Sequence, residues 1–308
     1  MIISTIPAAR SVSVVVATVD SVRSIRDCLQ RLRQTLEGSD SEIIVVDASR
    51  DGTADVVAEV GGYSELIRLP FGTLTPDLWA AGIARSRGRV VGLTTGHCLV
   101  PQPWAQVLAE RIGSNSVVGA AGALDLDDAA GVLDWAVFYL RYSEFIPFVN
   151  RSGEHVHTIP ADNAAYDGGD IRRYIESTAA GFWEVDFHRS ARAAGKSLAF
   201  VAAGTALFGR SFPFMTIAAH RFAHGRHSGS WRVQTGASTA IRSVLAAPLV
   251  PFVLAVRTAR RVSRVRRHLT RFLASLPIFF VLAASWAAGE AWGAVAGPDA
   301  RSFRPAQA

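Results

Sequence analysis

Short apolar runs rich in β-branched residues alternate with helical stretches through residues 11–121. The runs cover 11–19, 42–47, 64–69, 89–94 and 116–121. Between them, helical patterns are expected over 21–36, 53–60, 76–86 and 103–112. Buried strands that alternate with helices form parallel sheets covered on both faces. We therefore expect an α/β fold with a Rossmann-like, mostly parallel, doubly wound sheet. Residues 124–175 read as irregular and aromatic, and 179–194 as helical again.

The composition and two missing motifs narrow the possible functions. Apolar residues make up 49% of the chain and charged residues 19%, so the chain is expected to fold into a core. No Gly-x-Gly-x-x-Gly follows the first run, and the sequence contains no P-loop. These omissions argue against the two commonest nucleotide-binding loops.

Polar residues gather where the predicted strands end. Thr18 and Asp20 follow the first run, Asp47 and Asp51 follow the second, and Thr95-Gly96-His97 follows the fourth. Ligands of open α/β sheets bind beyond the carboxyl ends of the strands. This edge is the expected ligand site.

The segment EIIVVDASRDGT, a buried run that ends in Asp47 and leads to Asp51-Gly52-Thr53, resembles the nucleotide-sugar motif of family 2 glycosyltransferases of the GT-A fold. Four further stretches resemble that family in the same order: SVSVVVATVDSVRSIRDCL, GIARSRGRVVGLTTGHCLVPQPW, DNAAY and GFWEVDFHRSARAAGKSL. The resemblance covers residues 11–232. It implies a GT-A domain over 1–235, with a donor half at 1–123 and an acceptor half at 124–235.

The resemblance also implies roles for the donor-side residues. Thr18, Asp20, Asp47 and Asp51 would bind a nucleoside-diphosphate sugar, with Asp47 at the nucleoside. The alternative for Asp47 and Asp51 is a turn or cap residue that satisfies backbone donors.

The metal motif of the family is altered. The family has Asp-x-Asp after the fourth strand, whose carboxylates hold Mg²⁺ or Mn²⁺, and this chain has Thr95-Gly96-His97. His97 is then a metal ligand, a hydrogen-bond donor to phosphate, or a structural histidine. Use of a divalent cation stays open.

Three further sites follow from the resemblance. Glu184 would be the general base of an inverting transfer and Asp186 an orienting or capping group. The alternative is that the two carboxylates lie at a helix N-terminus because the helix dipole favours negative charge there. Asn163 would contact the acceptor, or shape a turn. His224 and Arg226 would belong to a lid over the leaving diphosphate, or to a solvated basic loop.

The positive charge is concentrated at the C-terminus. Residues 236–308 hold ten arginines against two acidic residues, and 1–235 carry a formal charge of −2. The arginines lie between uncharged stretches at 244–256 and 272–289, where Val262, Val265, Leu269 and Phe272 recur at helical spacing. This pattern favours anionic lipid over nucleic acid as a partner.

We therefore expect 236–297 to be an apolar helical hairpin with a basic amphipathic linker, followed by a flexible tail at 298–308. The hairpin would lie monotopically on the cytoplasmic face of a membrane. A two-pass hairpin, a buried soluble helix pair and a dimer interface are the alternatives. Two cysteines without a CxxC and no visible signal peptide favour the cytoplasm.

The expected function is transfer of a sugar, with inversion, from a nucleoside-diphosphate sugar to a lipid-linked, glycan or other membrane-proximal acceptor. A catalytically degenerate GT-A relative that only binds nucleotide-sugars is the main alternative. A nucleotidyltransferase would need a glycine-rich basic loop after the first strand, and SVVVATVDSVR contains none.

Overall fold

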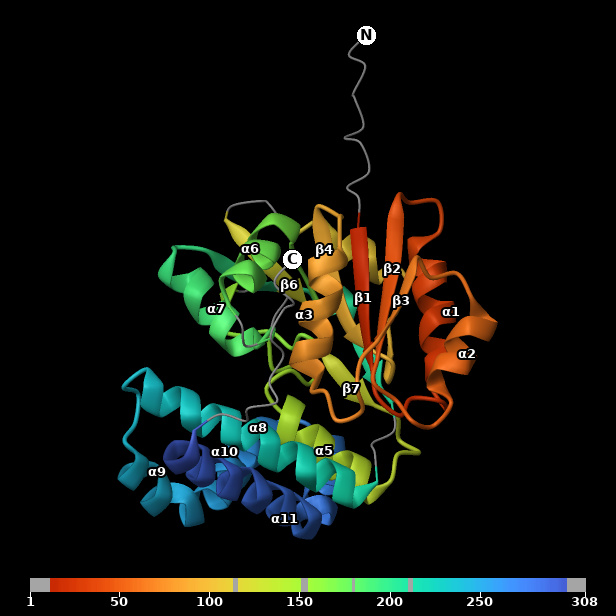
Figure 1. Ribbon diagram of the computed structural model, residues 1–308. Coiled ribbons are helices and arrows are strands. Elements are labelled where there is room, and N and C mark those ends of the chain that lie inside the picture. The colour runs from red at the N-terminus through yellow and green to blue at the C-terminus, as the bar shows by residue number, and fades with distance from the viewer. Residues whose placement is uncertain (1–11, 113–115, 151–154, 179–180, 210–212, 298–308) are drawn as a thin grey trace. The chain divides into compact units, whose positions relative to one another are not determined.

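The computed structural model describes residues 12–112, 116–150, 155–178, 181–209 and 213–297 (Figure 1). The expected tail at 298–308 lies outside them. Two compact units result: the described residues of Met1–Asp125 and Asn150–Leu207, and those of Leu126–Val149 and Phe208–Ser302. The expected domain boundary at residue 235 therefore falls inside the second unit.

The first unit contains two sheets. The larger consists of β1 (Val12–Thr18), β2 (Ser41–Asp47), β3 (Glu65–Arg68), β4 (Val90–Thr95), β6 (Val117–Ala121), β8 (His155–Val156), β9 (Asn163–Asp167) and β10 (Ser197–Phe200). Their order is β3-β2-β1-β4-β9-β6-β10-β8. The smaller, in the order β5-β11-β7, consists of β5 (Cys98–Leu99), β7 (Leu124–Leu126) and β11 (Ala206–Phe208).

The larger sheet is mostly parallel, as expected. β1 runs parallel to β2 and β4, β2 to β3, and β6 to β10. β9 is antiparallel to both of its neighbours, β4 and β6, and β8 is antiparallel to β10. The sheet is therefore mixed, and β9 separates its two parallel groups.

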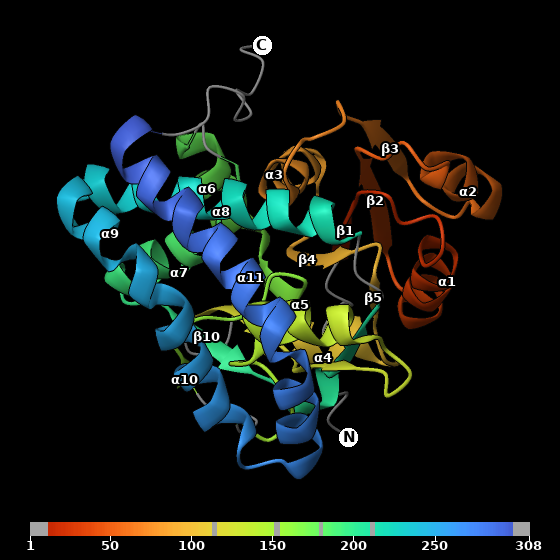
Figure 2. The same ribbon diagram turned by 90° about the horizontal axis from the view of Figure 1, so that it is seen from below.

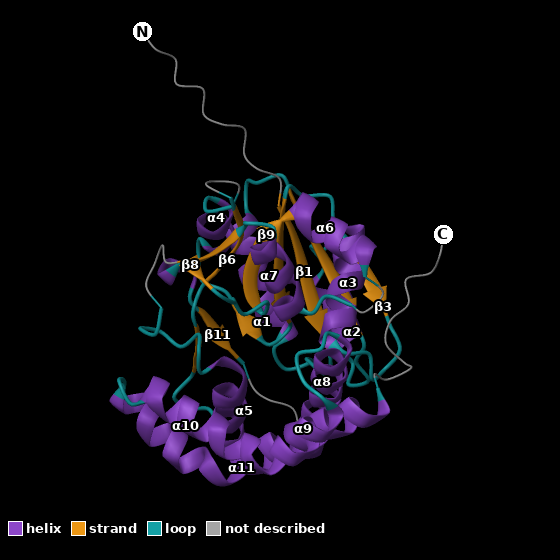
Figure 3. Cartoon of the chain, turned by 90° about the vertical axis from the view of Figure 1, so that its left-hand side faces the viewer, coloured by secondary structure: helices purple, strands orange, loops and turns teal. Residues whose placement is uncertain are grey.

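Helices cover both faces of the larger sheet (Figure 3). They are α1 (Ile25–Leu36), α2 (Thr53–Val60), α3 (Thr75–Arg85), α4 (Trp104–Ala109), α6 (Gly168–Ser177), α7 (Glu184–Ala193) and the short 3₁₀ turn η1 (Ala202–Gly204). Val14 and Val15 point to opposite faces of β1. A Cβ added to Gly82 of α3 would lie 2.2 Å from Val15 Cγ1, so α3 approaches that face closely. On the other face, Trp104 lies over Gly92, which pairs with Val14.

The expectation that residues 124–175 are irregular is wrong. This stretch holds β7, α5 (Val132–Tyr142), β8, β9 and α6. In α5, Trp135, Phe138, Tyr139 and Tyr142 follow helical spacing, and all four are buried. The aromatic residues form one face of a helix, which the irregular interpretation overlooked.

The second unit is built almost entirely from helices (Figure 2). They are α5, α8 (Phe214–Gln234), α9 (Ala240–Ala246), the 3₁₀ turn η2 (Ala247–Leu249), α10 (Val250–Val262) and α11 (Arg266–Ala296). The long α11 contacts α5, α8, α9 and α10. Phe272 and Phe279 on α11 are fully buried, so this helix supplies the core of the unit.

Glycines bring α8 and α11 together. A Cβ added to Gly229 of α8 would lie 1.9 Å from the carbonyl oxygen of Glu290, and one added to Gly293 of α11 would lie 1.9 Å from that of Arg226. Gly225 and Gly289 are equally close to the opposite backbone. Four glycines thus let the two helices touch backbone to backbone.

The expected amphipathic helix through the C-terminal arginines is broken. α10 ends at Val262 and α11 begins at Arg266. Val262 and Phe272 are buried inside the unit, and Arg261 and Arg267 pair with Glu144 and Asp128 at 2.8 Å. Part of the basic linker therefore stabilises the fold.

Two stretches, Ala240–Val262 and Arg266–Ala296, are long and apolar enough to cross a membrane. The core helix of a soluble protein can have the same length and composition, so these two properties do not by themselves establish a membrane span. The first stretch is largely exposed and the second more buried.

Candidate active site

The carboxyl ends of β1, β2 and β4 meet at one edge of the larger sheet. Thr18 pairs with Asp47, and Ala17 pairs with Thr95. The three polar segments expected from the sequence are therefore neighbours.

Asp47 is a buried carboxyl group at the end of β2. Its side chain is fully buried, and its Oδ1 accepts a hydrogen bond from Ser49 Oγ. Its Oδ2 lies 3.1 Å from Arg68 Nε in an ion pair, and no hydrogen bond to Oδ2 is found within the described residues. Burial raises the pKa of Asp47, and Ser49 and Arg68 oppose that rise. One acceptor oxygen is thus held at the strand end with lone-pair capacity left.

Two basic residues near the end of β2 were not predicted. Arg68 pairs with Asp47 in the β2–β3 register, and its side chain is 54% exposed. The guanidinium of Arg50 lies 4.0 Å from the ring centre of Phe71, which is itself exposed. The sequence contained one signal that could have identified Arg68: it lies near the end of an expected strand, as Asp47 lies at the end of the preceding one.

Asp20 and Asp51 tie together the loops after β1 and β2. Asp20 has a φ of +46°, and its Oδ1 accepts a hydrogen bond from the backbone N–H of Arg50 at 2.9 Å. Asp51 accepts from the backbone N–H groups of Thr53 and Val22, each at 3.1 Å. These contacts favour the turn-residue interpretation of Asp51. Donor binding by Asp20 and Asp51 stays a prediction.

Thr18 lies against the turn that follows β4. Its side chain is buried, and no hydrogen bond to Oγ1 is found in the described part of the chain. A Cβ added to Gly96 would come within 2.9 Å of this oxygen. Glycine at position 96 therefore lets this turn pack closely against Thr18.

His97 is buried between two hydroxyl groups. Its Nε2 lies 3.2 Å from Ser21 Oγ and its Nδ1 3.4 Å from Ser24 Oγ. Both ring nitrogens thus contact the segment that leads into α1. Of the three interpretations of His97, this geometry favours the structural one.

The residues after β4 do not fit a Mg²⁺ or Mn²⁺ site by themselves. Among the described residues, no group of three or more His, Cys, Asp or Glu side chains could hold a metal ion. The Thr95 hydroxyl lies 3.4 Å from Cys98 Sγ, and His97 contacts the two serines. Hard cations prefer carboxylate oxygens, and this turn supplies none.

Glu184 and Asp186 lie in the first turn of α7, as expected. Asp186 is 3.6 Å from Arg189 Nη1. Burial raises the pKa of Tyr166, and the negative charge of Glu184 adds to that rise. The helix N-terminus favours both carboxylates.

Two contacts hold the start of α7 near the strand ends. The backbone N–H of Phe182 donates to the carbonyl of Pro76, in the first turn of α3, at 2.8 Å. Trp79 of α3 packs edge-on against Phe182, and its indole N–H donates to the carbonyl of Thr94 at 3.1 Å. Glu184 is thereby carried on the same edge of the sheet as the donor-side loops.

Asn163 is fully buried, and its amide is engaged at both ends. Its Oδ1 accepts a hydrogen bond from Trp104 Nε1 at 2.6 Å. Its Nδ2 donates to the carbonyls of Ala123 and Gly204 at 2.8 and 2.9 Å. These bonds tie β9 to α4, to η1 and to the loop before β7. Acceptor binding by Asn163 stays a prediction that these contacts do not support.

His224 and Arg226 lie in the second unit. The expectation of a loop around them is wrong, because they belong to α8, whose glycines pack against α11. Arg226 Nε donates to the carbonyl of Gly297 at 3.1 Å. Desolvation and the nearby Arg221 lower the pKa of His224 well below its usual value, which favours a neutral imidazole. A role of the two residues at the donor stays a prediction.

The sequence matches the model of the family described as Glycosyl transferase family 2 over residues 13–174. A comparison with curated proteins finds no match. Among solved structures, the mannosyltransferase PcManGT from Pyrobaculum calidifontis, in complex with GDP-Man and Mn²⁺, is similar at a TM-score of 0.54 and 13% identity, with 90% of this chain and 87% of that chain covered. S. aureus TarS is similar at a TM-score of 0.50 and 13% identity, with 68% of this chain and 39% of TarS covered. At these identities the structures show a shared GT-A fold.

Proposed function

Because the chain belongs to glycosyl transferase family 2, we propose that it transfers a sugar, with inversion, from a nucleoside-diphosphate sugar to an acceptor at a membrane. The observation that carries the proposal is the ion pair of the buried Asp47 with Arg68, at the ends of two neighbouring strands on the ligand-binding edge of the sheet. The similar mannosyltransferase binds GDP-Man, which supports a nucleotide-sugar as the donor.

Asp47 and Thr18 bind the donor in this proposal. Oδ2 of Asp47 accepts a hydrogen bond from an N–H of the nucleobase, because it is buried and keeps lone-pair capacity. The Thr18 hydroxyl, which has no hydrogen-bond partner among the described residues, bonds to the next part of the nucleotide. Arg68 opposes the rise in the pKa of Asp47 that burial causes.

Glu184 acts as the general base. The acceptor hydroxyl oxygen attacks the anomeric carbon while the bond from that carbon to the diphosphate oxygen breaks. Glu184 takes the hydroxyl proton, and the nucleoside diphosphate leaves with the bonding electrons. Asp186, paired with Arg189, orients the start of α7.

The leaving diphosphate needs positive charge or hydrogen-bond donors. Because the residues after β4 do not fit a resident metal ion, we assign this task to protein donors. The resemblance gives this task to His224 and Arg226 of the second unit, and their role at the donor stays a prediction.

The acceptor is membrane-proximal, and the protein lies on the cytoplasmic face. The described residues offer no ion-pair or hydrogen-bond partner to the side chains of Arg257, Arg260, Arg264 and Arg266, which are all exposed. Ile241 and Leu245 expose apolar side chains on the preceding helix. A basic end beside an apolar surface fits an anionic bilayer and an acceptor carried on lipid.

A panel of UDP- and GDP-sugars tests the proposed function. Full-length protein should release nucleoside diphosphate from one member of the panel when lipid acceptor is present. One observation favours a second candidate, a nucleotide-sugar-binding protein without turnover: the Asp-x-Asp position holds Thr95-Gly96-His97. Tight donor binding with no release of diphosphate would identify this second candidate.

A further inference from the structure

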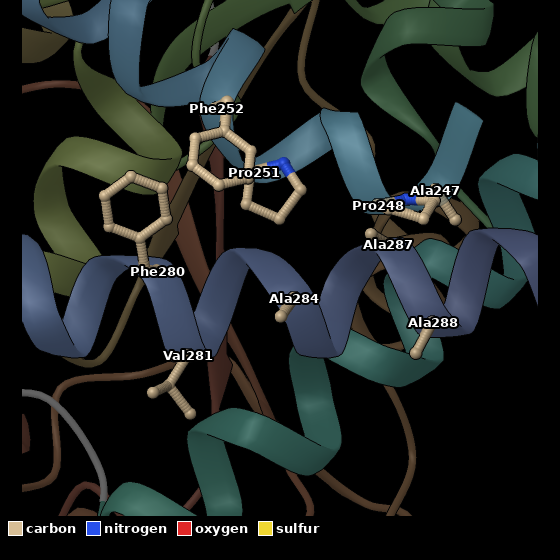
Figure 4. A pocket seen from close by; sticks show the side chains of 9 residues that line it. All are labelled: Ala247, Pro248, Pro251, Phe252, Phe280, Val281, Ala284, Ala287 and Ala288. Carbon is tan, nitrogen blue, oxygen red and sulfur yellow. The ribbon is translucent and has the colours of Figure 1, made fainter. Parts of the chain in front are cut away.

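The second unit contains an open groove of about 520 Å³ between η2–α10 and α11 (Figure 4). On one wall lie Pro248, Pro251 and Phe252, and on the other Phe280, Ala284 and Ala287. All lining side chains are alanine, proline, valine or phenylalanine, and none has a hydrogen-bonding group. A polar ligand would lose its hydrogen bonds to water and gain none here, so the groove favours hydrocarbon.

The shape of the groove is elongated. Its walls run antiparallel, with the Phe252 and Phe280 rings 5.3 Å apart near one end. From Phe280 to Ala288, α11 advances about 12 Å at 1.5 Å per residue. Ala284 and Ala288 are exposed and small, so the middle of the groove is open to an extended chain.

Exposed apolar side chains precede the groove along the chain. Ile241, Leu245 and Leu249 follow helical spacing on α9 and η2 and are 74%, 73% and 64% exposed. Most of the apolar stretch Ala240–Val262, to which they belong, is exposed. Such a surface is costly in water and favourable in the acyl region of a bilayer.

Positive charge lies at one end of the same helix. Phe252, Val256 and Arg260 are spaced four apart and so share one face of α10. Arg260 stands about 12 Å beyond Phe252 along the axis, and Arg257 is on the adjoining turn. A hydrocarbon chain in the groove would therefore have cationic groups beyond the phenylalanine pair, where a phosphate head would be stabilised.

We propose that this groove binds the hydrocarbon chain of the phosphate-bearing lipid that carries the acceptor, with the phosphate at Arg257 and Arg260. That the bound lipid carries the acceptor rests on the proposed function. That the groove binds a hydrocarbon chain rests on the groove alone. The observation that selects lipid over other apolar partners is the charge at one end: a single chain with an anionic head matches an apolar groove that ends in arginines.

The test uses full-length protein and dodecyl phosphate below its micelle-forming concentration, with binding followed by calorimetry. Ala284→Trp fills the groove from an exposed position, and we expect it to weaken binding about tenfold or more, since loss of two buried methylene groups costs that much. Val253→Trp is the matched control, because Val253 is exposed on α10 and does not line the groove. It should bind as the wild type does.

The head is tested separately. Arg260→Gln should weaken dodecyl phosphate several-fold and leave the affinity for dodecan-1-ol unchanged. Equal affinity of Ala284→Trp and wild type for dodecyl phosphate would overturn the proposal. So would conversion of a dimer to a monomer by Ala284→Trp without loss of probe binding, because the groove would then be a contact between two copies.

The readouts separate this proposal from the proposed function. Groove-dependent probe binding in a protein that releases no diphosphate from any nucleotide-sugar keeps the lipid-chain site and removes the transferase. Sugar transfer together with unchanged probe binding by Ala284→Trp keeps the transferase and removes the groove.

Discussion

Nε of Arg68 lies 3.1 Å from Oδ2 of Asp47, although Arg68 is largely exposed and Asp47 is fully buried. The two residues end neighbouring parallel strands and are direct partners in the register. Burial of a carboxyl group favours its protonated form, and the guanidinium favours the ionised form. In this protein the burial effect is larger, so the pKa of Asp47 is raised. A carboxyl group that costs folding energy at a ligand-binding edge is expected to serve a ligand.

Asp47→Asn should weaken nucleotide-sugar binding about 10- to 100-fold, because a hydrogen bond to a charged acceptor is worth about 1.5–3 kcal/mol. The apo protein should not lose stability. The folded pKa of Asp47 lies above the unfolded value, so its ionisation disfavours folding as pH rises past the unfolded value, and at pH 7 the substitution removes that cost. Donor titration and thermal unfolding at pH 7 measure the two effects.

Asp55→Asn is the matched control for Asp47→Asn, since Asp55 is exposed on α2. It should change neither quantity. If Asp47→Asn keeps full donor affinity but melts at a clearly lower temperature, Asp47 is a structural residue only.

Glu184→Gln should lower kcat about 10²- to 10⁴-fold with donor affinity retained, because the amide keeps the shape of the side chain and removes its basicity. Single-turnover transfer and donor titration separate the two quantities. Glu176→Gln, on the exposed side of α6, should behave as the wild type does. Normal turnover by Glu184→Gln would transfer the role of base to Asp186.

The strands and helices of the donor side could be predicted from the sequence because their signals are local. β-Branched runs specify β1, β2 and β4, and parallel pairing then brings Thr18, Asp47 and Thr95 to one edge. The contact of Arg68 with Asp47 depends on the register of β3 against β2. That register is set by packing across the sheet and could not be read from either segment.

The helical second unit was harder to predict because its core is made by distant segments. Gly225 and Gly229 lower the helical propensity of their segment when the sequence is considered alone. Their role in helix packing becomes visible only in the structure, where they and Gly289 and Gly293 of α11 lie against the backbone of the opposite helix. His224 and Arg226 therefore looked like loop residues. The arginines around Val262 and Phe272 were read as part of one amphipathic helix, yet Arg261 and Arg267 have acidic partners far away in the sequence.

Activity should largely persist in a chelator. The turn after β4 supplies no carboxylate, and His97 already contacts Ser21 and Ser24. Transfer rates in EDTA, with and without added Mn²⁺ or Mg²⁺, measure this dependence. His97→Asn should lower thermal stability and leave the Mn²⁺ response as it is. Complete loss of activity in EDTA, restored by Mg²⁺ alone, would count decisively against a metal-independent site.

The stability of the protein should fall as pH decreases below about 6.5, in part because of His188. Burial, with help from Arg192, lowers the pKa of His188 to about 3. Below about pH 6.5 the histidine is protonated in the unfolded chain and stays neutral in the folded protein. One such group therefore lowers the free energy of unfolding by at most about 1.4 kcal/mol for each pH unit as pH falls. Urea unfolding at several pH values between 7 and 4.5 gives the slope.

His188→Gln should flatten this slope, since the amide cannot titrate and can still bond to Tyr166 and Thr158, the present partners of the ring. His155→Gln, at an exposed position, is the control and should keep the wild-type slope. Identical slopes for His188→Gln and wild type would show that His188 does not cause the loss.

Vesicle binding should depend on the exposed arginines at the end of α10. Each arginine near an anionic surface contributes about 1 kcal/mol, so Arg257→Gln/Arg260→Gln should weaken binding to anionic vesicles about 30-fold. Arg31→Gln/Arg33→Gln removes the same charge from exposed positions on α1 and should have little effect. Co-sedimentation at low and high salt measures both.

High salt should release the wild type only partly, because Ile241, Leu245 and Leu249 offer an apolar contact that salt does not screen. Full release by salt would mean that charge alone holds the protein, and equal losses in the two double variants would place the membrane contact outside α10.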